Sequence, residues 1–450
     1  MAEIKPFRGW RYSLAKVGKN NLREVVCAPY DVMGWEAQQR YLERNRHNIV
    51  RLELGETFPE DNSDHNRYTR AATVLQNWKE EGLLLQDSQP FYYLYEQEFT
   101  LNGRHYRRQS LMAALRLEEY SRGIVLPHER ILAHTLTERL ALLKAIKINL
   151  NAVFCLYDDS EGQVDYLYSI ALEEPPLYQF ADEWNHQHRL YPIHQPKLLA
   201  LLTQAFADKK LYLADGHHRY QTALNYQAER QGSGDLGCNP VDYIMVALTA
   251  FQDAGLCITP LHRTVSGLGA AQLAKLELSL THFFHVEEVS LADKEDHALF
   301  AAELVQHANT LTDYTGEEHH VLGMYYLRPE GTSRFLLLKL KSVESAARRM
   351  PPYSKAWQRQ EVAILHSLIL EGFLGLSDQS KTVDEQLGYT RHAHEALARV
   401  NNGTAQLAFL LPPTRLPDLR AVADTQEPMP PKSTYFYPKF MTGLVMRPLD

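Results

Sequence analysis

Cysteine is scarce in this chain and never falls into a pattern that would hold a metal ion or form a disulfide framework. Among 450 residues there are four cysteines, Cys27, Cys155, Cys238 and Cys257, and no Cys-x-x-Cys pair. Such widely spaced thiols indicate reduced, mostly packed side chains rather than a disulfide scaffold or a zinc ribbon.

Long apolar runs and an excess of positive charge are also missing. No run is long enough to span a bilayer, and the first residues contain no apolar core of a signal peptide. The formal net charge is −8 at pH 7, whereas a large nucleic-acid surface needs clustered positive charge. We therefore expect a cytoplasmic protein that binds a small molecule but neither nucleic acid nor membrane, with a homodimer left open.

Two motifs that would identify a catalytic class are absent. There is no Walker A glycine-lysine loop, and there is no His-Glu-x-x-His helix. Histidine is nevertheless plentiful, with 20 residues that include the pairs His186/His188 and His217/His218. Neighbouring or next-but-one positions on a helix do not share a face. A metal site built from strands or loops stays open, and no firm set of metal ligands is assigned.

The most informative stretch of the chain is a predicted strand, turn and helix around Asp215. An apolar run, Leu211-Tyr-Leu-Ala214, predicts a buried strand, and Asp215-Gly216 predicts a turn. The helix that follows would carry His217, His218 and Arg219 on its first turn. Exposed backbone N–H groups and the positive end of the helix dipole suit an anion such as phosphate there. The alternative is an ordinary solvated helix cap.

Two further apolar runs end in similar polar clusters. A short run stops at Pro127 and presents His128-Glu129, and another ends at His262-Arg263. Ligands bind at strand ends that meet at one crevice of an open α/β sheet. These four side chains are therefore candidate pocket residues, although a His-Glu pair in a loop is often only part of a turn.

The alternating stretch Asn48–Leu54 predicts a half-buried strand. Val50, Leu52 and Leu54 would face inward, and Arg51 and Glu53 would share the other face. Such a charged pair is usually solvated, but next to a phosphate site Glu53 would serve as a general base. Asp31, in a loop after Pro29, would project toward the same site.

Most other segments give clear secondary-structure signals. Asn102-Gly103 between alternating runs predicts a β-hairpin, on which Arg107 and Arg108 are expected to be exposed. Further predicted elements are helices over 36–44, 66–81, 132–150, 196–207, 356–374 and 416–424, and strands over 152–157, 166–173, 189–193, 243–250, 256–260, 321–327, 334–340, 406–411 and 441–446.

These elements predict a mixed α+β protein in two regions. The first, residues 1–265, would carry the site, and the second, residues 266–450, would be a C-terminal α+β region. The tail 429–446 is rich in hydroxyls, aromatic rings and lysines. It would either pack as an irregular tail or fold back on the site with Lys432, Ser433 and Thr434.

The chain resembles, nearly end to end, the bacterial and archaeal family called domain of unknown function 1015. The matching words are Pro6-Phe7, Arg11-Tyr12, Ala28-Pro-Tyr-Asp-Val32, Asn48-Ile-Val-Arg-Leu-Glu53, Leu126-Pro-His-Glu129, Ala214-Asp-Gly-His-His-Arg-Tyr220, Pro260-Leu-His-Arg263 and Lys432-Ser-Thr-Tyr-Phe-Tyr-Pro-Lys439. The loop at Ala28 has one proline where the family more often has two.

A second resemblance concerns Asp215-Gly-His-His-Arg219. This word is similar to the phosphate-binding Gly-x-x-Arg motif of ParB- and sulfiredoxin-like domains, with Gly216 and Arg219 at the matching positions. The resemblance implies a ParB/sulfiredoxin-like core that holds nucleotide phosphates. Some members, such as archaeal free-serine kinases, phosphorylate a small amino acid, and others are nucleotide-hydrolysing switches.

Three functions remain open at this point. The first is a phosphotransferase that uses Mg²⁺ and ATP or ADP to phosphorylate a small polar metabolite. In it, His218, Arg219 and the helix start would hold the phosphoryl group, and Asp215 or Glu53 would act as base, Asp215 alternatively as Mg²⁺ ligand. The second is a nucleotide-sensing protein without turnover. The third is a metal-dependent phosphohydrolase built on the histidines.

Overall fold

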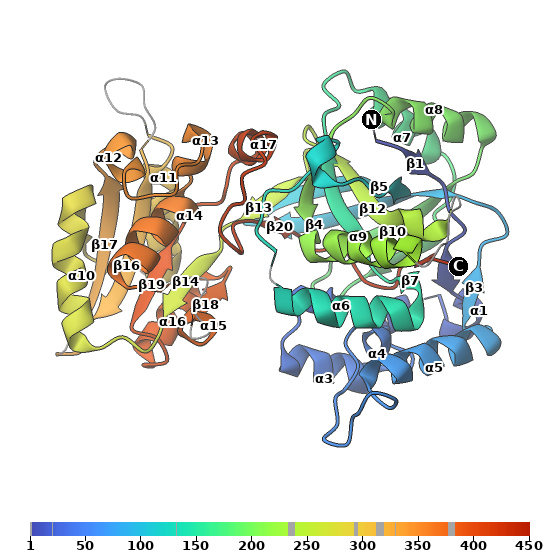
Figure 1. Cartoon of the computed structure of the whole chain (residues 1–450), viewed down its shortest axis with the longest axis horizontal. Coiled ribbons are helices and arrows are strands. Elements are labelled where there is room, and N and C mark those ends of the chain that lie inside the picture. The colour runs from blue at the N-terminus through green and yellow to red at the C-terminus, as the bar shows by residue number, and fades with distance from the viewer. Residues whose placement is uncertain are drawn as a thin grey trace. The chain divides into compact units, whose positions relative to one another are not determined.

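The computed structural model describes residues 2–19, 21–131, 133–232, 239–291, 296–311, 319–328, 330–376 and 383–450. These residues form two compact units, and Figure 1 shows them with many of the helices and strands labelled. Unit 1 comprises Met1–Pro127, Ile131–Cys257 and Pro438–Asp450, and unit 2 comprises His128–Arg130 and Ile258–Tyr437. The C-terminal segment thus belongs to the unit that also contains the N-terminus.

Unit 1 is built on a mixed sheet with the strand order β6-β11-β8-β12-β5-β4-β10-β9, in which β1 pairs with β5. The pairs β6/β11 and β8/β12 are parallel, and the other pairs are antiparallel. The strands are β1 (Ile4–Lys5), β4 (Tyr92–Leu101), β5 (Arg104–Arg116), β6 (Val125–Leu126), β8 (Val153–Tyr157), β9 (Tyr178–Ala181), β10 (Gln187–Ile193), β11 (Leu211–Asp215) and β12 (Tyr243–Ala250).

Helices cover one face of this sheet, and the C-terminal segment covers part of the other. Alternate residues of the central strands, such as Val153 and Leu213, form one buried cluster with α7 (Gln163–Ala171) and α8 (Pro196–Phe206). On the opposite face, the ring of Phe440 packs edge-on against Phe154 with centroids 4.9 Å apart. Since strand residues alternate between faces, this contact explains why residues after Pro438 belong to unit 1.

The remaining helices of unit 1 pack beside the sheet, where α6 contacts both α5 and α9 (Figure 1). Two small sheets pair β2 (Trp10–Tyr12) with β3 (Leu84–Gln86), and β7 (Ile148–Asn149) with β21 (Arg447–Pro448). The helices are α1 (Leu14–Val17), α2 (Leu22–Val25), α3 (Trp35–Arg44), α4 (Val50–Glu53), α5 (Arg67–Glu80), α6 (Ala133–Ile146) and α9 (His217–Gly232).

Unit 2 is an antiparallel sheet with the order β15-β17-β16-β19-β14-β18 and helices on both faces. Its strands are β14 (His262–Val265), β15 (Phe284–Val289), β16 (Val321–Leu327), β17 (Ser333–Leu340), β18 (Leu387–Thr390) and β19 (Leu407–Leu410); β13 (Cys257–Thr259) pairs with β20 (Tyr435–Tyr437). Its helices are α10 (Ala270–Phe283), α11 (His297–Ala308), α12 (Val343–Ala347), α13 (Lys355–Gln358), α14 (Glu361–Ile364), the π-helix η4 (Leu365–Phe373), α15 (Val383–Gln386), α16 (Ala393–Asn401) and α17 (Leu416–Asp424). The expected mixed α+β class is confirmed.

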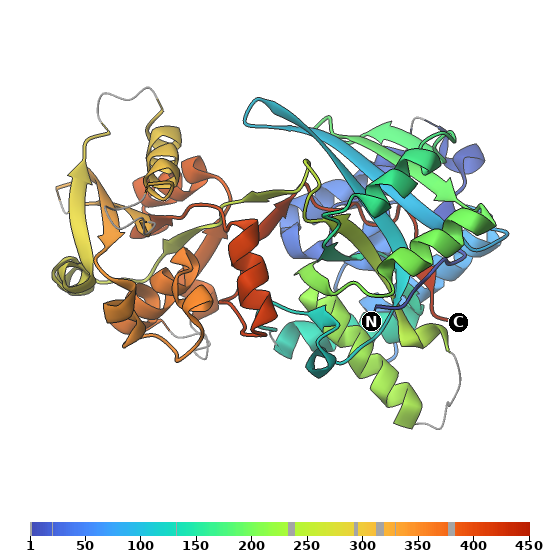
Figure 2. The same ribbon diagram turned by 90° about the horizontal axis from the view of Figure 1, so that it is seen from above.

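The predicted hairpin around Asn102-Gly103 is confirmed. Asn102 and Gly103 both have positive φ, at 51° and 74°, as a two-residue hairpin turn requires. Figure 2 shows β4 and β5 as two long light-blue arrows that run side by side. Arg108 was expected to be exposed but is buried, because its guanidinium lies over the ring of Phe440, 4.6 Å from the centroid.

The strand predicted over Asn48–Leu54 is wrong, because Val50–Glu53 is the helical turn α4. The side chain of Asn48 accepts a hydrogen bond from the Val50 N–H (3.0 Å) and donates to the carbonyls of Glu24 and Val26. These bonds fix a turn where alternation alone suggested an extended chain. As a consequence Glu53 is buried together with Val50 and Leu52 rather than exposed beside Arg51.

Four other expected elements also need correction. The single helix predicted over 356–374 is interrupted at Arg359 and Gln360, which separate α13 from α14 and the π-helix η4. Most of the predicted strand over 166–173 lies in α7, which ends at Ala171 and whose N–H groups at Val164 and Asp165 donate to the Asp159 carboxylate. The helix predicted over 132–150 ends at Ile146, since Lys147 takes a φ of 49°; Leu132 lies outside the described residues. The stretch 441–446 makes only isolated bridges at Thr442 and Met446, because Gly443 has a φ of 90°.

Candidate functional site

The predicted strand, turn and helix around Asp215 is confirmed in unit 1. β11 ends at Asp215, α9 begins at His217, and Gly216 lies between them with a φ of 86°. This left-handed conformation is favourable for glycine and strained for residues with a Cβ atom. His217 is buried and His218 is half-buried on the first turn of α9. The start of α9 therefore lies inside the unit and does not form a solvated cap.

Arg219 folds back over this turn instead of extending into water. Its Nη1 donates to the carbonyl of Ala152 at 2.6 Å, and its Nη2 lies 3.3 Å from Oδ2 of Asp215. A Cβ atom at Gly216 would lie 3.0 Å from Cζ of Arg219. The glycine therefore serves two purposes, a backbone turn and space for the guanidinium.

We expect Gly216→Ala to destabilise the protein by about 1–3 kcal/mol, because alanine is strained at this φ. The added methyl group would also displace Arg219, so phosphate or nucleotide affinity should fall together with stability. Urea unfolding and calorimetric titration measure the two effects. Gly82→Ala is the matched control, since Gly82 also has positive φ but its Cβ atom would meet nothing within 4 Å. Equal binding by the two variants would contradict the role of Gly216 at the site.

Asp215 is held between two cations. Besides Arg219, Nζ of Lys439 lies 3.0 Å from Oδ1 of Asp215. Lys439 belongs to the C-terminal segment, and sequence analysis did not select it, because nothing in the local sequence separates it from Lys432. Burial lowers the pKa of Arg219, but the carboxylates of Asp215, Asp31 and Glu53 outweigh burial, and the net pKa is raised. Arg219 therefore stays charged in a buried environment.

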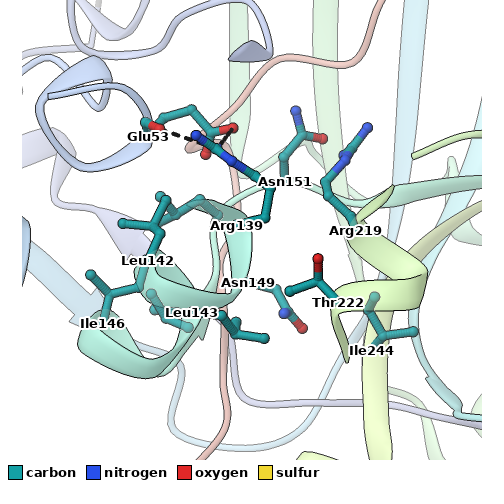
Figure 3. Close-up of a pocket in the computed structure, with 12 residues that line it drawn as sticks. Glu53, Arg139, Leu142, Leu143, Ile146, Asn149, Asn151, Arg219, Thr222 and Ile244 are labelled. Atoms are coloured by element: carbon teal, nitrogen blue, oxygen red, sulfur yellow. Dashed lines mark hydrogen bonds and ion pairs between the residues drawn. The ribbon is translucent and has the colours of Figure 1, made fainter. Parts of the chain in front are cut away.

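Glu53 lies in a pocket beside α9 that Arg219 also lines. Figure 3 shows Arg139 reaching from α6 to Glu53, with Asn151 and Arg219 next to each other on another wall. Nη1 of Arg139 lies 3.5 Å from Oε1 of Glu53, and its guanidinium stacks 3.9 Å from the ring centroid of Tyr30. Apolar side chains of α6, among them Leu142 and Ile146, complete a cavity of about 60 Å³.

The buried position of Glu53 changes its acidity. Burial raises the pKa of the Glu53 carboxyl above its ordinary value of 4.5, although Arg139 and Arg219 work in the opposite direction, and the nearby charge of Asp31 adds to the rise. A buried carboxyl group whose pKa is raised although cations lie nearby is typical of a general acid or base.

Several buried polar atoms at this pocket have no hydrogen-bond partner among the described residues. They are Nε of Arg139, Nε of Arg219 and Oγ1 of Thr222. Oδ1 of Asp31 is likewise buried without a hydrogen-bond partner among the described residues. Asp31 interacts electrostatically with both Glu53 and Arg219. Buried polar atoms in folded proteins are almost always paired, so a group of unpaired ones makes this pocket a candidate ligand site.

The other predicted site residues belong to unit 2 and form a set of their own. Nε2 of His128 lies 3.2 Å from Oγ1 of Thr434, and Oε1 of Glu129 accepts the backbone N–H of Lys432 at 3.0 Å. Arg263 is buried and donates to the carbonyls of Leu261 and Lys432. The Lys432 side chain is exposed, whereas Ser433 is buried and donates a hydrogen bond to the Pro430 carbonyl. In this unit the predicted residues therefore hold the 428–434 loop in place through hydrogen bonds.

His262 is part of the core of unit 2. Its Nδ1 accepts the backbone N–H of Leu411 at 3.2 Å, which requires a neutral ring. Burial, with the positive charges of Arg263 and His392, lowers the pKa of His262 to about 3.

His262 should make the protein sensitive to acid. The unfolded chain binds a proton near pH 6.5 and the folded chain does not, so stability is lost as the pH falls from 6.5 toward 3. The loss attributable to this residue would be about 1.4 kcal/mol for each pH unit in that window. We expect His262→Asn to lose stability less steeply than the wild type in urea unfolding at pH 6, 5 and 4. Exposed His285→Gln is the control, and identical slopes for His262→Asn and the wild type would refute the assignment.

Comparison with models of known protein families identifies the family of this chain. The model of the family described as protein of unknown function DUF1015 matches residues 4–357, so the chain belongs to this family, as the sequence words predict. A comparison with curated proteins finds no match.

Several solved structures are similar to the chain at low identity. A free serine kinase in complex with AMP has a TM-score of 0.32 at 11% identity over 70% of this chain and 83% of its own. A conserved hypothetical protein from Pyrococcus furiosus has a TM-score of 0.33 at 12% identity over 71% of this chain and 92% of its own. SbnI with a C-terminal truncation, from Staphylococcus aureus, has a TM-score of 0.34 at 10% identity over 75% of this chain and 87% of its own. Such low TM-scores assign neither a site nor an activity to this chain.

One further finding concerns membranes. Among the described helices, none is long and apolar enough to cross a bilayer.

Proposed function

We propose that unit 1 is a nucleotide-dependent phosphotransferase that acts on a hydroxyl group of a small polar metabolite, such as an amino acid. The observation that carries the proposal is the buried Glu53 carboxyl, which pairs with Arg139 in a pocket that Arg219 also lines and in which several buried polar atoms have no partner among the described residues. This reaction needs a base that takes the proton of the attacking hydroxyl group, and cations such as guanidinium groups that stabilise the charge on the phosphoryl group while it passes from the nucleotide to that hydroxyl.

The phosphate end of the nucleotide is assigned to the turn before α9. Gly216 leaves room for the Arg219 guanidinium over the turn, and the Nε–H of Arg219 has no hydrogen-bond partner among the described residues. Arg139 offers a second Nε–H in the same pocket. Guanidinium forks bind phosphate oxygens with good geometry and keep their charge when buried.

Glu53 is assigned as the base. Its raised pKa keeps the proton affinity of the carboxylate higher than that of an exposed glutamate. The apolar wall made by α6 excludes water, which strengthens each charge interaction at the reacting group.

A magnesium ion would accompany the nucleotide phosphates, and Asp31 fits it better than Asp215. Among the described residues, Oδ1 of Asp31 is a buried carboxylate oxygen without a hydrogen-bond partner, and carboxylate oxygens are the kind of ligand Mg²⁺ prefers. Both oxygens of Asp215 face cations, Arg219 and Lys439. When bound, the ion would neutralise charge on the phosphates.

The decisive experiment has two parts. Calorimetric titration with ATP, ADP and CTP, each with Mg²⁺, should show binding of at least one nucleotide at micromolar to millimolar concentration. Incubation of that nucleotide with a pool of small hydroxyl metabolites should then give a new phosphate ester by phosphorus NMR. Failure of all three nucleotides to bind at millimolar concentration would reject the proposal.

A non-catalytic nucleotide sensor is the second candidate, and the ion pairs of Asp215 favour it. A carboxylate clamped by Arg219 and Lys439 suits a structural or signalling contact that a bound phosphate would replace. Tight nucleotide binding without any product on prolonged incubation would support this candidate, as would Asp215→Asn if it kept full binding while Arg219→Ala lost it.

A further inference from the structure

Three metal-binding side chains meet in unit 1 at the turn between β9 and β10. Asp182 follows β9, His186 precedes β10, and His188 lies in it. On an extended segment next-but-one residues share a face, so His186 and His188 point the same way, which a helix would not allow. The turn also has Asn185 with a φ of 63°, a conformation that asparagine tolerates. All three side chains are buried.

The geometry of the three side chains is that of a coordination site. One donor atom from each residue lies within 4.8 Å of the others. Nδ1 of His186 is 3.0 Å and Nε2 of His188 is 3.2 Å from Oδ2 of Asp182. Ligands about 2.0–2.1 Å from a tetrahedral zinc ion are separated from one another by about 3.3 Å. A small inward or outward adjustment of these side chains would therefore place an ion between them.

Surrounding groups orient the carboxylate. Oδ1 of Asp182 accepts the backbone N–H groups of Trp184 (2.9 Å) and His186 (2.8 Å). With Oδ1 occupied by the backbone, Oδ2 is the oxygen presented to the two imidazoles. Such supporting bonds are a regular feature of metal sites.

Nε2 of His188 provides an independent observation. The ring is only 1% exposed and is stacked between Phe180 and Tyr95, with centroids 4.9 and 5.9 Å away. Its Nδ1 is held by the hydroxyl of Tyr95 at 2.6 Å. Nε2 lies close to Asp182 yet has no aligned hydrogen bond among the residues the structure describes. A deeply buried nitrogen is thus directed at the Asp182 carboxylate, 3.2 Å away, without the alignment of a hydrogen bond among the described residues, and an ion between the two atoms would satisfy both.

We propose that Asp182, His186 and His188 bind one Zn²⁺ ion, which fastens the β9–β10 turn. Two imidazoles and one carboxylate suit zinc and neighbouring transition metals, whereas Mg²⁺ and Ca²⁺ prefer oxygen ligands alone. The fourth position would be taken by a water molecule. The competing explanation is a hydrogen-bonded Asp-His-His cluster that holds a proton rather than a metal.

Metal binding by the full-length protein tests the proposal. Protein treated with a chelator and then dialysed should take up one equivalent of Zn²⁺ and melt at a higher temperature with it. It should also give the intense visible bands of tetrahedral Co²⁺ when cobalt replaces zinc. Mg²⁺ at the same concentration should produce neither effect.

Two variants locate the site. His188→Gln removes a ligand and should abolish stoichiometric uptake. Tyr95→Phe keeps all three ligands but removes the support of His188, and it should weaken zinc binding about 10–100-fold. Exposed His105→Gln is the control and should bind zinc like the wild type.

Two outcomes would overturn the proposal. One is wild-type protein that takes up no zinc and shows no cobalt bands, a result that does not depend on how any variant folds. The other is uptake that both variants leave unchanged. Neither measurement involves a nucleotide, so this test is independent of the proposed phosphotransferase.

Discussion

Replacing Glu53 by glutamine should lower the rate of phosphoryl transfer about 10²–10⁴-fold, the contribution of a positioned general base. The amide keeps the size of the side chain but cannot take a proton. Nucleotide affinity should change little, because Arg219 and the turn before α9 remain. Single-turnover kinetics and calorimetric titration on the same preparation measure both quantities. Glu36→Gln, a substitution at an exposed site on α3, is the matched control.

The pH dependence of the wild-type activity gives a second test of Glu53 as the base. Since its pKa is raised, the carboxylate forms only above the ordinary value of 4.5, and activity should rise with pH through that shifted pKa. Glu53→Gln should lose this acidic limb along with most of the rate. A variant with wild-type activity or an unchanged acidic limb would exclude Glu53 as the base.

The thermal stability of the protein should depend on pH in the direction opposite to that of the activity. A carboxyl group with a raised folded pKa adds stability below its unfolded pKa, and this contribution is lost as the pH rises through the folded value. Glu53→Gln removes that loss, so it should melt at a higher temperature than the wild type at pH 8 and at a similar temperature at pH 4. A lower melting temperature at pH 8 would instead identify the Glu53–Arg139 pair as a structural salt bridge.

Arg219→Ala should weaken nucleotide binding about 10–100-fold, the effect of losing charge-assisted hydrogen bonds to phosphate, and the transfer rate by a further factor of about 10²–10³. Arg219→Lys should recover only part of the affinity, because an ammonium group lacks the planar fork. Titration with ADP and ATP measures the change, and Arg230→Ala, at the exposed far end of α9, is the control.

Arg219 also has a structural role, so its variants must be compared at known stability. It bonds the carbonyl of Ala152 and pairs with Asp215, and the alanine variant should unfold at lower urea. Lys439 would still neutralise Asp215, which limits the damage. A folded Arg219→Ala protein that binds nucleotide like the wild type would remove the phosphate role from this residue and leave only the structural one.

The sequence alone determined those parts of the protein whose cause is local. Asn102-Gly103 specified a hairpin because only certain residues accept two successive positive φ angles. The apolar run before Asp215-Gly216 specified a strand, a turn and a helix start. The sequence motifs of the family were recognisable without coordinates. Asn48–Leu54 failed because alternation over seven residues fits one helical turn as well as a strand, and the side-chain bonds of Asn48 decided between them.

Only the tertiary structure decided which distant groups share an environment. The carboxyl of Glu53 meets Arg139, and Asp215 meets Lys439, through the packing of α4, α6 and the C-terminal segment around α9. Arg108 is buried because the ring of Phe440 covers it, and His188 gains Tyr95 only through the pairing of β10 with β4. Dihedral preferences and periodicity act over a few residues, whereas burial and charge pairing depend on segments that the folded chain brings together from far apart.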